Sequence, residues 1–236
     1  MRTLLLGEAI ADLISHPSGA LVPRVGGAAA TIAQAAARHG TQVALAAATG
    51  DDLWGRWLRG ELEAAGVALD HLVADPGRQT AVVFHTEDGT ALYGDPELPR
   101  GDPPQLDALV VTSSTIATDD ERAITLLARD HAVKAGAPVI AVADLRVHRW
   151  ATPAQWASEA RELARDAYLF VADAEEARLL TGEEQPAAAA DGLVAMGATH
   201  AIVLAPRGAI VRCAGLRSAA AAPGPIAPGP DRKSVV

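Results

Sequence analysis

The stretch Gly26-Gly27-Ala28-Ala29-Ala30-Thr31-Ile32-Ala33-Gln34-Ala35-Ala36-Ala37-Arg38-His39-Gly40 decides how this chain is interpreted. A glycine pair opens the stretch, and an alanine-rich segment that favours helix follows it to about Arg38. Gly40 is a typical C-terminal stop, because glycine adopts the left-handed conformation that ends many helices. The next residues, 42–47, predict a strand, so this region has the order of helix followed by strand.

The same alternation of strand and helix recurs along the rest of the chain. It is typical of a mostly parallel central sheet covered by helices. Two segments, 9–25 and 80–94, instead have the pattern of hairpins with glycine in the turn, and they predict a small accessory sheet. Strands are predicted at 3–6, 108–111, 138–143, 168–171, 200–204 and 209–213, and helices at 53–65, 119–135, 153–164, 174–180 and 187–196.

Composition and charge limit the class of protein. The 236 residues fit one large domain, or one domain with a small appendage, and 50% of them are hydrophobic. The formal net charge of −9 is spread without a basic stripe, which argues against nucleic acid and anionic membrane as partners. Cys213 is the single cysteine, so no intrachain disulfide is possible, and no apolar run approaches the ~18 residues of a membrane helix. We therefore expect a cytoplasmic protein.

Several short motifs follow one another in a characteristic order, which resembles that of the pfkB (ribokinase-like) family of carbohydrate kinases. Each motif alone is weakly specific, but together they extend over nearly the whole chain. The motifs are Gly7–Asp12, Gly26–Ala33 reaching Gly40, Thr49–Gly55, Asp144–Arg146 with Trp150, and Asp173–Glu176 with Leu180–Gly182.

The resemblance implies a fold and a reaction. The fold would be an α/β/α sandwich with a mostly parallel central sheet and a small β lid, formed by residues 1–217. The reaction would be phosphoryl transfer from ATP, with Mg²⁺, to a hydroxyl of a small-molecule sugar, and the lid strands would pair two copies into a homodimer. The resemblance implies that the sugar is bound by Asp12, Gly26, Gly27, Thr31 and Arg146, and the nucleotide and its phosphates by Asp173, Glu176 and Gly208.

Each of these residues also has a purely structural interpretation. Asp12 could be a surface acid at a strand end, and Arg146 a member of a surface salt bridge. Asp173 and Glu176 have the spacing of a capping box, which satisfies the free amides at a helix start. Gly208 fits an ordinary hairpin turn. Thr31 stands where the family has asparagine, and a hydroxyl lacks the paired donor and acceptor of an amide.

The end of the chain differs from the family pattern. The family's Gly-Ala-Gly-Asp loop, with its aspartate base, should follow the strand after Cys213, but an Ala/Pro/Gly-rich segment stands there. We therefore name no catalytic residue and no metal ligand, and we expect a C-terminal part of the domain to be missing. Residues 218–236 are predicted to form a flexible tail. Its last six residues match the translation of a common sequencing-adapter DNA, so we expect a non-native end.

Three functions are compatible with these features. The first is the N-terminal portion of an ATP-dependent carbohydrate kinase, inactive as this chain because the catalytic loop is absent. The second is a diverged pseudokinase that binds a sugar or nucleoside without turnover, which the departures at Thr31, Val203 and Ala205 favour. The third is a Rossmann-type NAD enzyme, which suits the strand–helix alternation but lacks the G-x-G-x-x-G fingerprint.

Overall fold

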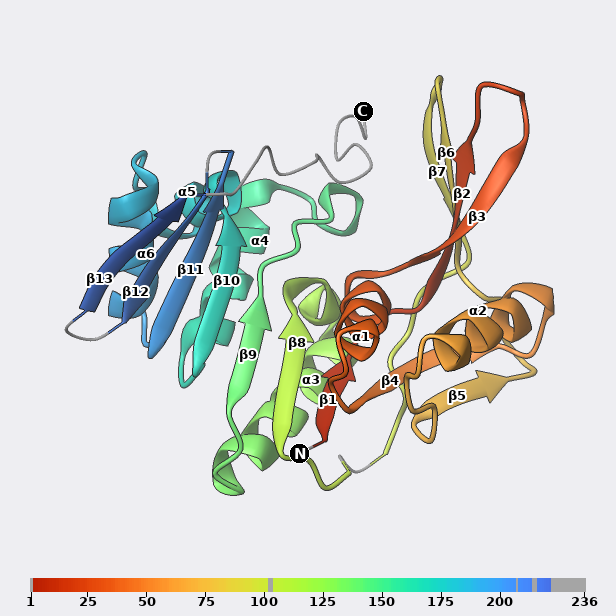
Figure 1. Ribbon diagram of the computed structural model, residues 1–236, viewed down its shortest axis with the longest axis horizontal. Helices are drawn as coiled ribbons and strands as arrows, with labels where there is room; N and C mark the ends of the chain where they lie inside the picture. Colours follow the sequence, from red (N-terminus) through yellow and green to blue (C-terminus); the bar gives the residue numbers. More distant parts are fainter. Residues whose placement is uncertain (1, 102–103, 207, 214–215, 222–236) are drawn as a thin grey trace.

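The computed structural model describes residues 2–101, 104–206, 208–213 and 216–221. Its larger sheet has nine strands in the order β13-β12-β11-β10-β9-β8-β1-β4-β5 (Figure 1). Neighbours from β11 to β5 are parallel, and β12 and β13 join antiparallel. The predicted mostly parallel sheet is thus confirmed. Its strands are β1 (Thr3–Leu6), β4 (Val43–Gly50), β5 (Leu72–Asp75), β8 (Ala108–Thr112), β9 (Val139–Val142), β10 (Leu169–Asp173), β11 (His200–Ala205), β12 (Gly208–Cys213) and β13 (Leu216–Ala221).

Helices cover the two faces of this central sheet unequally. α1 (Ala28–Arg38) and α2 (Leu53–Ala64) pack on one face against Leu5 and Leu45. α3 (Asp119–Lys134), α4 (Pro153–Ala160), α5 (Ala174–Thr181) and α6 (Pro186–Ala195) pack on the other against Leu109 and Phe170. Successive residues of a strand point to opposite faces, so the continuous apolar runs of β1 and β8 supply both cores. No helix in the described part of the chain is long and apolar enough to cross a membrane.

A second sheet, which we call the lid sheet, stands away from the central sheet at the upper right of Figure 1. Its order is β3-β2-β6-β7, from β2 (Ile10–Ser15), β3 (Leu21–Gly26), β6 (Val82–Thr86) and β7 (Gly89–Tyr93). It lies where the accessory hairpins were predicted. Because β2 follows β1 after three residues and β3 ends one residue before the N-cap of α1, the lid is attached directly to β1, the third strand from the β5 edge of the larger sheet, and to the start of α1.

The structure differs from the predictions at three places. The helix expected over 153–164 is α4 followed by a 3₁₀ turn at Arg161–Ala164. The short strand β5 was not predicted, because its apolar run is only three residues long and two of its four residues are exposed. Residues 218–221 of the expected tail belong instead to strand β13. Backbone pairing with β12 does not depend on large side chains, so an alanine-rich segment can extend the sheet. Residues 222–236 lie outside the described part.

The Thr49–Gly55 motif fastens the lid sheet to the central sheet. The Asp52 carboxylate caps α2 by accepting from the Gly55 amide at 2.8 Å. It also accepts from the amide and the hydroxyl of Thr80, two residues before β6, at 2.7 and 2.8 Å. A Cβ atom on Gly55 would lie under 3.0 Å from the Gly50 carbonyl oxygen, so the turn needs glycine there. The motif therefore has a structural role in positioning the lid.

Replacing Asp52 by alanine is expected to lower the free energy of unfolding by about 2–4 kcal/mol, because it removes a helix cap and leaves the buried Thr80 amide without its acceptor. Burial raises the pKa of Asp52, but hydrogen bonds from Thr80, Gly55 and Trp54 outweigh burial and lower it overall. This contribution is therefore present at neutral pH and is lost as the pH falls through the lowered pKa. Urea unfolding of the wild-type chain and of Asp52→Ala, at neutral and at acid pH, measures the loss of stability and its dependence on pH. Asp51→Ala, which removes only an exposed pair with Arg56, should cost under about 1 kcal/mol.

One face of β9–β12 carries no helix in the described part of the chain. α4, α5 and α6 all pack on the opposite face, through Phe170, Ala201 and Val203. On the uncovered face the strand registers align Val142, Val171, Ile202 and Val211 in one row, all of them partly exposed. Parallel sheets are usually buried on both faces, so this row is an unusual apolar surface.

Because this face is uncovered, we expect copies of the chain to associate with one another. The chain should bind the dye ANS and sediment as more than one species, because exposed apolar surface drives both. A Val171→Thr, Ile202→Thr double variant should reduce both signals, since threonine keeps the strand preference while adding a hydroxyl. Val203→Thr, on the buried face of the same strand, should instead destabilise the fold without reducing dye binding. A monodisperse wild-type chain that does not bind the dye would contradict the prediction.

Candidate functional site

A buried ion cluster lies where the central sheet meets the lid. Glu8, in the loop between β1 and β2, is 2% exposed and pairs with Arg149. Arg149 also binds Glu121 of the first turn of α3, with its Nη2 atom 2.8 and 2.7 Å from the two carboxylate oxygens. Burial raises the pKa of Glu8, and the Arg149 charge opposes that rise. One guanidinium thus joins three segments that are far apart in the sequence.

The lid contributes a second carboxylate, Asp12 of β2. Its side chain packs so closely on Gly26 that a Cβ atom there would lie under 3.0 Å from the carboxylate. His85 of β6 places its Nε2 atom 3.4 Å from Asp12 Oδ1. Burial raises the pKa of Asp12, and His85 is the main opposing influence. Asp12 is therefore a partly buried acid of the lid sheet, in close contact with Gly26 and near His85.

Gly27 brings the start of α1 against the Glu8 loop. Its φ of 82° lies in the left-handed region, and a Cβ atom would lie under 3.0 Å from the Glu8 carbonyl oxygen. The Ala30 amide donates to that same oxygen at 3.3 Å. Thr31, one residue further on, is exposed, and its hydroxyl is 3.5 Å from the Val25 carbonyl oxygen. Among the described contacts, none joins Thr31 to Asp12.

Arg146 lies between the two groups of carboxylates. Its Nε atom is 3.0 Å from Asp144 Oδ2, and the Asp144 side chain is 5% exposed. Burial disfavours the charged form of Arg146, but Asp144 first, then Glu8 and Asp12, favour it and raise its pKa overall. The partner of Arg146 is therefore a buried acid at the edge of the central sheet, and its charge also acts on the lid carboxylate.

Asp173 and Glu176 form the capping box that their spacing predicts. Asp173 Oδ1 accepts from the Glu176 amide at 2.8 Å, and Glu176 Oε2 accepts from the Asp173 amide at 2.9 Å. The other oxygen, Oε1, accepts from the Leu145 amide at 3.0 Å. Glu176, which is 3% exposed, thus ties the start of α5 to the loop that carries Arg146.

Gly208 begins β12 directly opposite Ala205, the last residue of β11, and its φ of 149° favours glycine. Asp173 is the register partner of Leu204, the residue before Ala205. The predicted phosphate-side residues Asp173 and Gly208 therefore lie at the same edge of the sheet. This is the carboxyl edge of the parallel strands, where open α/β sheets bind ligands.

Magnesium in phosphate-binding sites is a different case from a metal centre that protein ligands build alone. Within the described residues no group of three or more His, Cys, Asp or Glu side chains could hold a metal ion by itself. Magnesium in such sites is usually bound by one or two carboxylates together with substrate phosphates and water. Asp173 and Glu176 place carboxylates at this edge, and three of their oxygens accept from backbone amides.

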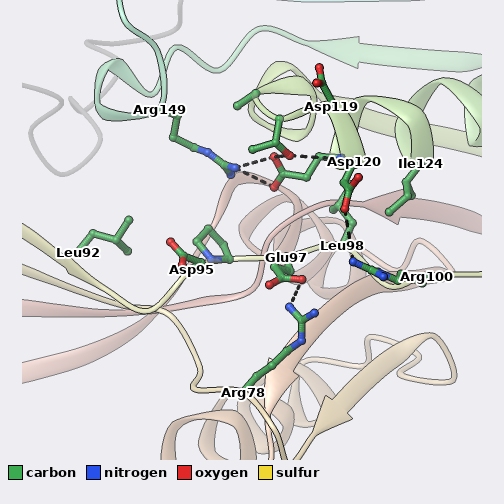
Figure 2. Close-up of a pocket in the computed structure, with 14 residues that line it drawn as sticks. Arg78, Leu92, Asp95, Glu97, Leu98, Arg100, Asp119, Asp120, Ile124 and Arg149 are labelled. Carbon is green, nitrogen blue, oxygen red and sulfur yellow. Dashed lines mark hydrogen bonds and ion pairs between the residues drawn. The ribbon is translucent and has the colours of Figure 1, made fainter.

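A pocket of about 660 Å³ opens beside the ion cluster (Figure 2). It lies between the end of the lid strand β7, the following loop and the first turn of α3, and Arg149 forms part of its wall. In Figure 2 Arg78 faces Glu97 and Arg100 faces Asp120 across this space. The pocket is large enough for a small polar molecule.

Comparison with known families agrees with this geometry. The model of the pfkB family carbohydrate kinases matches residues 4–212, and the chain therefore belongs to this family. Among curated relatives, the chain is 31% identical to the 5-dehydro-2-deoxygluconokinase of Photobacterium profundum over 54% of this chain and 43% of that protein. It is 29% identical to the fructokinase of Salmonella typhimurium, over 63% of this chain and 52% of that protein. The chain thus spans about half the length of these relatives, or less.

Solved structures share the fold. The fructokinase from Vibrio cholerae O395 in its fructose-, ADP- and calcium-bound form has a TM-score of 0.83 at 24% identity, covering 94% of this chain and 76% of that one. The aminoimidazole riboside kinase from Salmonella enterica has a TM-score of 0.85 at 22% identity, covering 95% and 77%. These matches confirm the ribokinase-like α/β fold.

The structure adds residues to the site that sequence analysis did not select. Glu8 and Asp144 stand inside quoted motifs but were not assigned a role, and Arg149 was not selected. Glu121 lies in the first turn of the helix predicted over 119–135, and the sequence analysis assigned it no role. What distinguishes these residues is burial and mutual pairing, which are properties of the folded chain.

Proposed function

We propose that this chain carries the sugar-binding part of an ATP-dependent carbohydrate kinase that acts on a fructose-like sugar. The observation that carries the proposal is the Asp12 carboxylate of the lid sheet, packed against Gly26, the residue before the Gly27 N-cap of α1. Carboxylates accept strong hydrogen bonds from hydroxyl groups, and a glycine turn lets a ligand approach the backbone closely. Membership of the pfkB family and the fructokinases among its relatives support the sugar.

The proposed site residues form two groups, one for the sugar and one for the nucleotide. Asp12, the glycine pair and Arg146 would bind and orient the sugar. Asp173, Glu176 and Gly208 lie along the same carboxyl edge, where the nucleotide would be held. ATP with Mg²⁺, when bound, would supply the phosphoryl group. The capping box keeps Glu176 in one orientation, and that fixed orientation supports a role in positioning the phosphates.

Binding and turnover are tested separately. The wild-type chain should bind D-fructose in a calorimetric titration. Asp12→Asn should weaken binding by about 10- to 100-fold, which corresponds to the free energy of a hydrogen bond to a charged group. Asp88→Asn removes the same charge at the exposed lid turn and should leave affinity unchanged. Equal affinities for wild type and Asp12→Asn would contradict the proposed role.

A second candidate is a pseudokinase that binds a sugar without turnover. Val203 and Ala205 depart from the family's nucleotide-site turn, and Val203 is fully buried on the helix-covered face of β11. A coupled assay of ADP release, with fructose and ATP, distinguishes the two functions when it is run on this chain and on a longer version that includes the family's Gly-Ala-Gly-Asp loop. Fructose-dependent ADP release by the longer version alone supports the kinase, whereas fructose binding without ADP release by both supports the pseudokinase.

The remaining partners follow from the same proposal. The sugar would be a small molecule of the cytoplasm, and the lid would pair two copies. The edge strand β3 exposes Leu21 and Val22, which are 43% and 40% accessible and could pack against a second lid. Loss of a dimer on replacing both by serine, measured by sedimentation, would support this arrangement.

A further inference from the structure

The hydroxyl group of Ser113 makes three hydrogen bonds in the interior of the protein. Ser113 is the first residue after β8, in the 3₁₀ turn Ser113–Ile116, and it is fully buried. Its Oγ atom accepts from the Asp144 amide at 2.9 Å and from Trp156 Nε1 at 2.8 Å. It also donates to the Asp144 carbonyl oxygen at 3.2 Å. A hydroxyl group has one hydrogen to donate and two lone pairs, so these three bonds use its whole capacity.

Two of these bonds fix the backbone of one residue, Asp144, at the point where β9 has ended. The Ala143 amide before it still pairs with β10, donating to a carbonyl oxygen of that strand at 2.8 Å. The Leu145 amide after it donates to Glu176 Oε1 at 3.0 Å. The Asp144 amide and carbonyl are held by Ser113 instead. A small side chain can serve both groups only if it both donates and accepts, which a hydroxyl does and a methyl does not.

Asp144 in turn holds Arg146 in two ways. Its Oδ2 atom accepts from Arg146 Nε at 3.0 Å, and its carbonyl oxygen accepts from the Arg146 amide at 3.1 Å. That carbonyl oxygen is the same one that accepts from Ser113. The charge of Arg146 interacts with that of Asp12 in the lid sheet. A chain of contacts therefore leads from Ser113 through Asp144 to the arginine that faces the proposed sugar site.

We propose that Ser113 is a positioning residue of the sugar site, which fixes the backbone of Asp144 and thereby the place of the Arg146 guanidinium; this inference rests on the proposed function. The donors of a guanidinium form a rigid planar fork, so a small displacement misaligns its hydrogen bonds to a ligand. The bond from Trp156, a fully buried residue of α4, ties that helix to the central sheet and has no part in sugar binding.

Three single variants separate positioning from stability, each titrated with D-fructose below its own melting transition. Ser113→Ala should weaken fructose binding by about three- to tenfold, because Arg146 is kept but loses part of its alignment. Ser113→Thr keeps the hydroxyl but adds a methyl group to a packed interior, so it should lower the melting temperature while affinity stays within about twofold of wild type. Trp156→Phe removes only the indole donor, and it should also lower the melting temperature while affinity is unchanged.

A double-mutant cycle tests the route through Arg146. Arg146→Gln removes the guanidinium and keeps a side-chain donor for Asp144. Arg146→Gln alone should weaken fructose binding. If Ser113 acts through this arginine, adding Ser113→Ala to Arg146→Gln should change fructose affinity by less than about twofold, whereas the same change in the wild-type chain has its full effect.

The outcomes separate this inference from the proposed function. If wild type binds fructose and Ser113→Ala binds it equally well, the inference is overturned while the proposed sugar site stands. The same holds if Ser113→Thr and Trp156→Phe lose as much affinity as Ser113→Ala, or if Ser113→Ala has its full effect without Arg146. If Ser113→Ala does not fold, Ser113→Cys, which keeps the size but bonds weakly, takes its place in each comparison. If folded wild type does not bind fructose, the proposed function fails and this inference with it.

Discussion

Replacing Arg149 by methionine is expected to lower the free energy of unfolding by about 3–5 kcal/mol at neutral pH, the usual cost of removing one member of a buried ion pair. The substitution removes the ion-pair partner of Glu8 and Glu121, which are 2% and 6% exposed, and leaves Glu8 only the weaker influence of Arg146. Burial already raises the pKa of Glu8, and losing Arg149 raises it further. Because a protonated carboxyl needs no counter-charge, the deficit should shrink as the pH is lowered below the raised pKa.

Urea unfolding of both chains over a range of pH measures this deficit. Arg100→Met is the matched control, because its pair with Asp120 is exposed on both sides and should contribute under about 1 kcal/mol. Adding Glu8→Gln to Arg149→Met should recover part of the loss at neutral pH. A deficit that is small, or that does not depend on pH, would show that the cluster is not held by charge.

Replacing Gly27 by alanine is expected to cost at least about 3 kcal/mol of stability and to weaken sugar binding. Two effects add: the φ of 82° disfavours any side chain, and the new Cβ would overlap the Glu8 carbonyl oxygen. The overlap pushes the start of α1 away from the Glu8 loop, so the turn beneath Asp12 opens. Thermal unfolding and fructose titration measure the two consequences.

Gly40 provides a control with nearly the same backbone. Its φ is 83°, but nothing lies within 4 Å of a Cβ atom built on it. Gly40→Ala should therefore cost only the conformational penalty of about 1–2 kcal/mol and leave fructose affinity unchanged. Similar losses for the two variants would mean that the close approach to Glu8 contributes nothing.

The candidate site was only partly predictable from the sequence. Asp12, Gly26 and Gly27 were selected through the family resemblance, and the structure brings them together. Arg146 lies near them through its charge, whereas Thr31 is exposed on α1. The capping interaction of Asp173 and Glu176 was predicted from local spacing and is confirmed, because both residues belong to one turn. A nucleotide role for that pair remains a proposal.

The sequence by itself determined the alternation of strands and helices, the glycine-opened α1 and the capping box of α5. These features depend on residues within a few positions of one another, so local patterns contain them. Only the tertiary structure decided that Glu8, Glu121 and Arg149 form one buried cluster, and that one face of β9–β12 has no helix over it in the described residues. Burial and ion pairing join segments more than a hundred residues apart, and no local pattern records which charged side chains lose their water on folding.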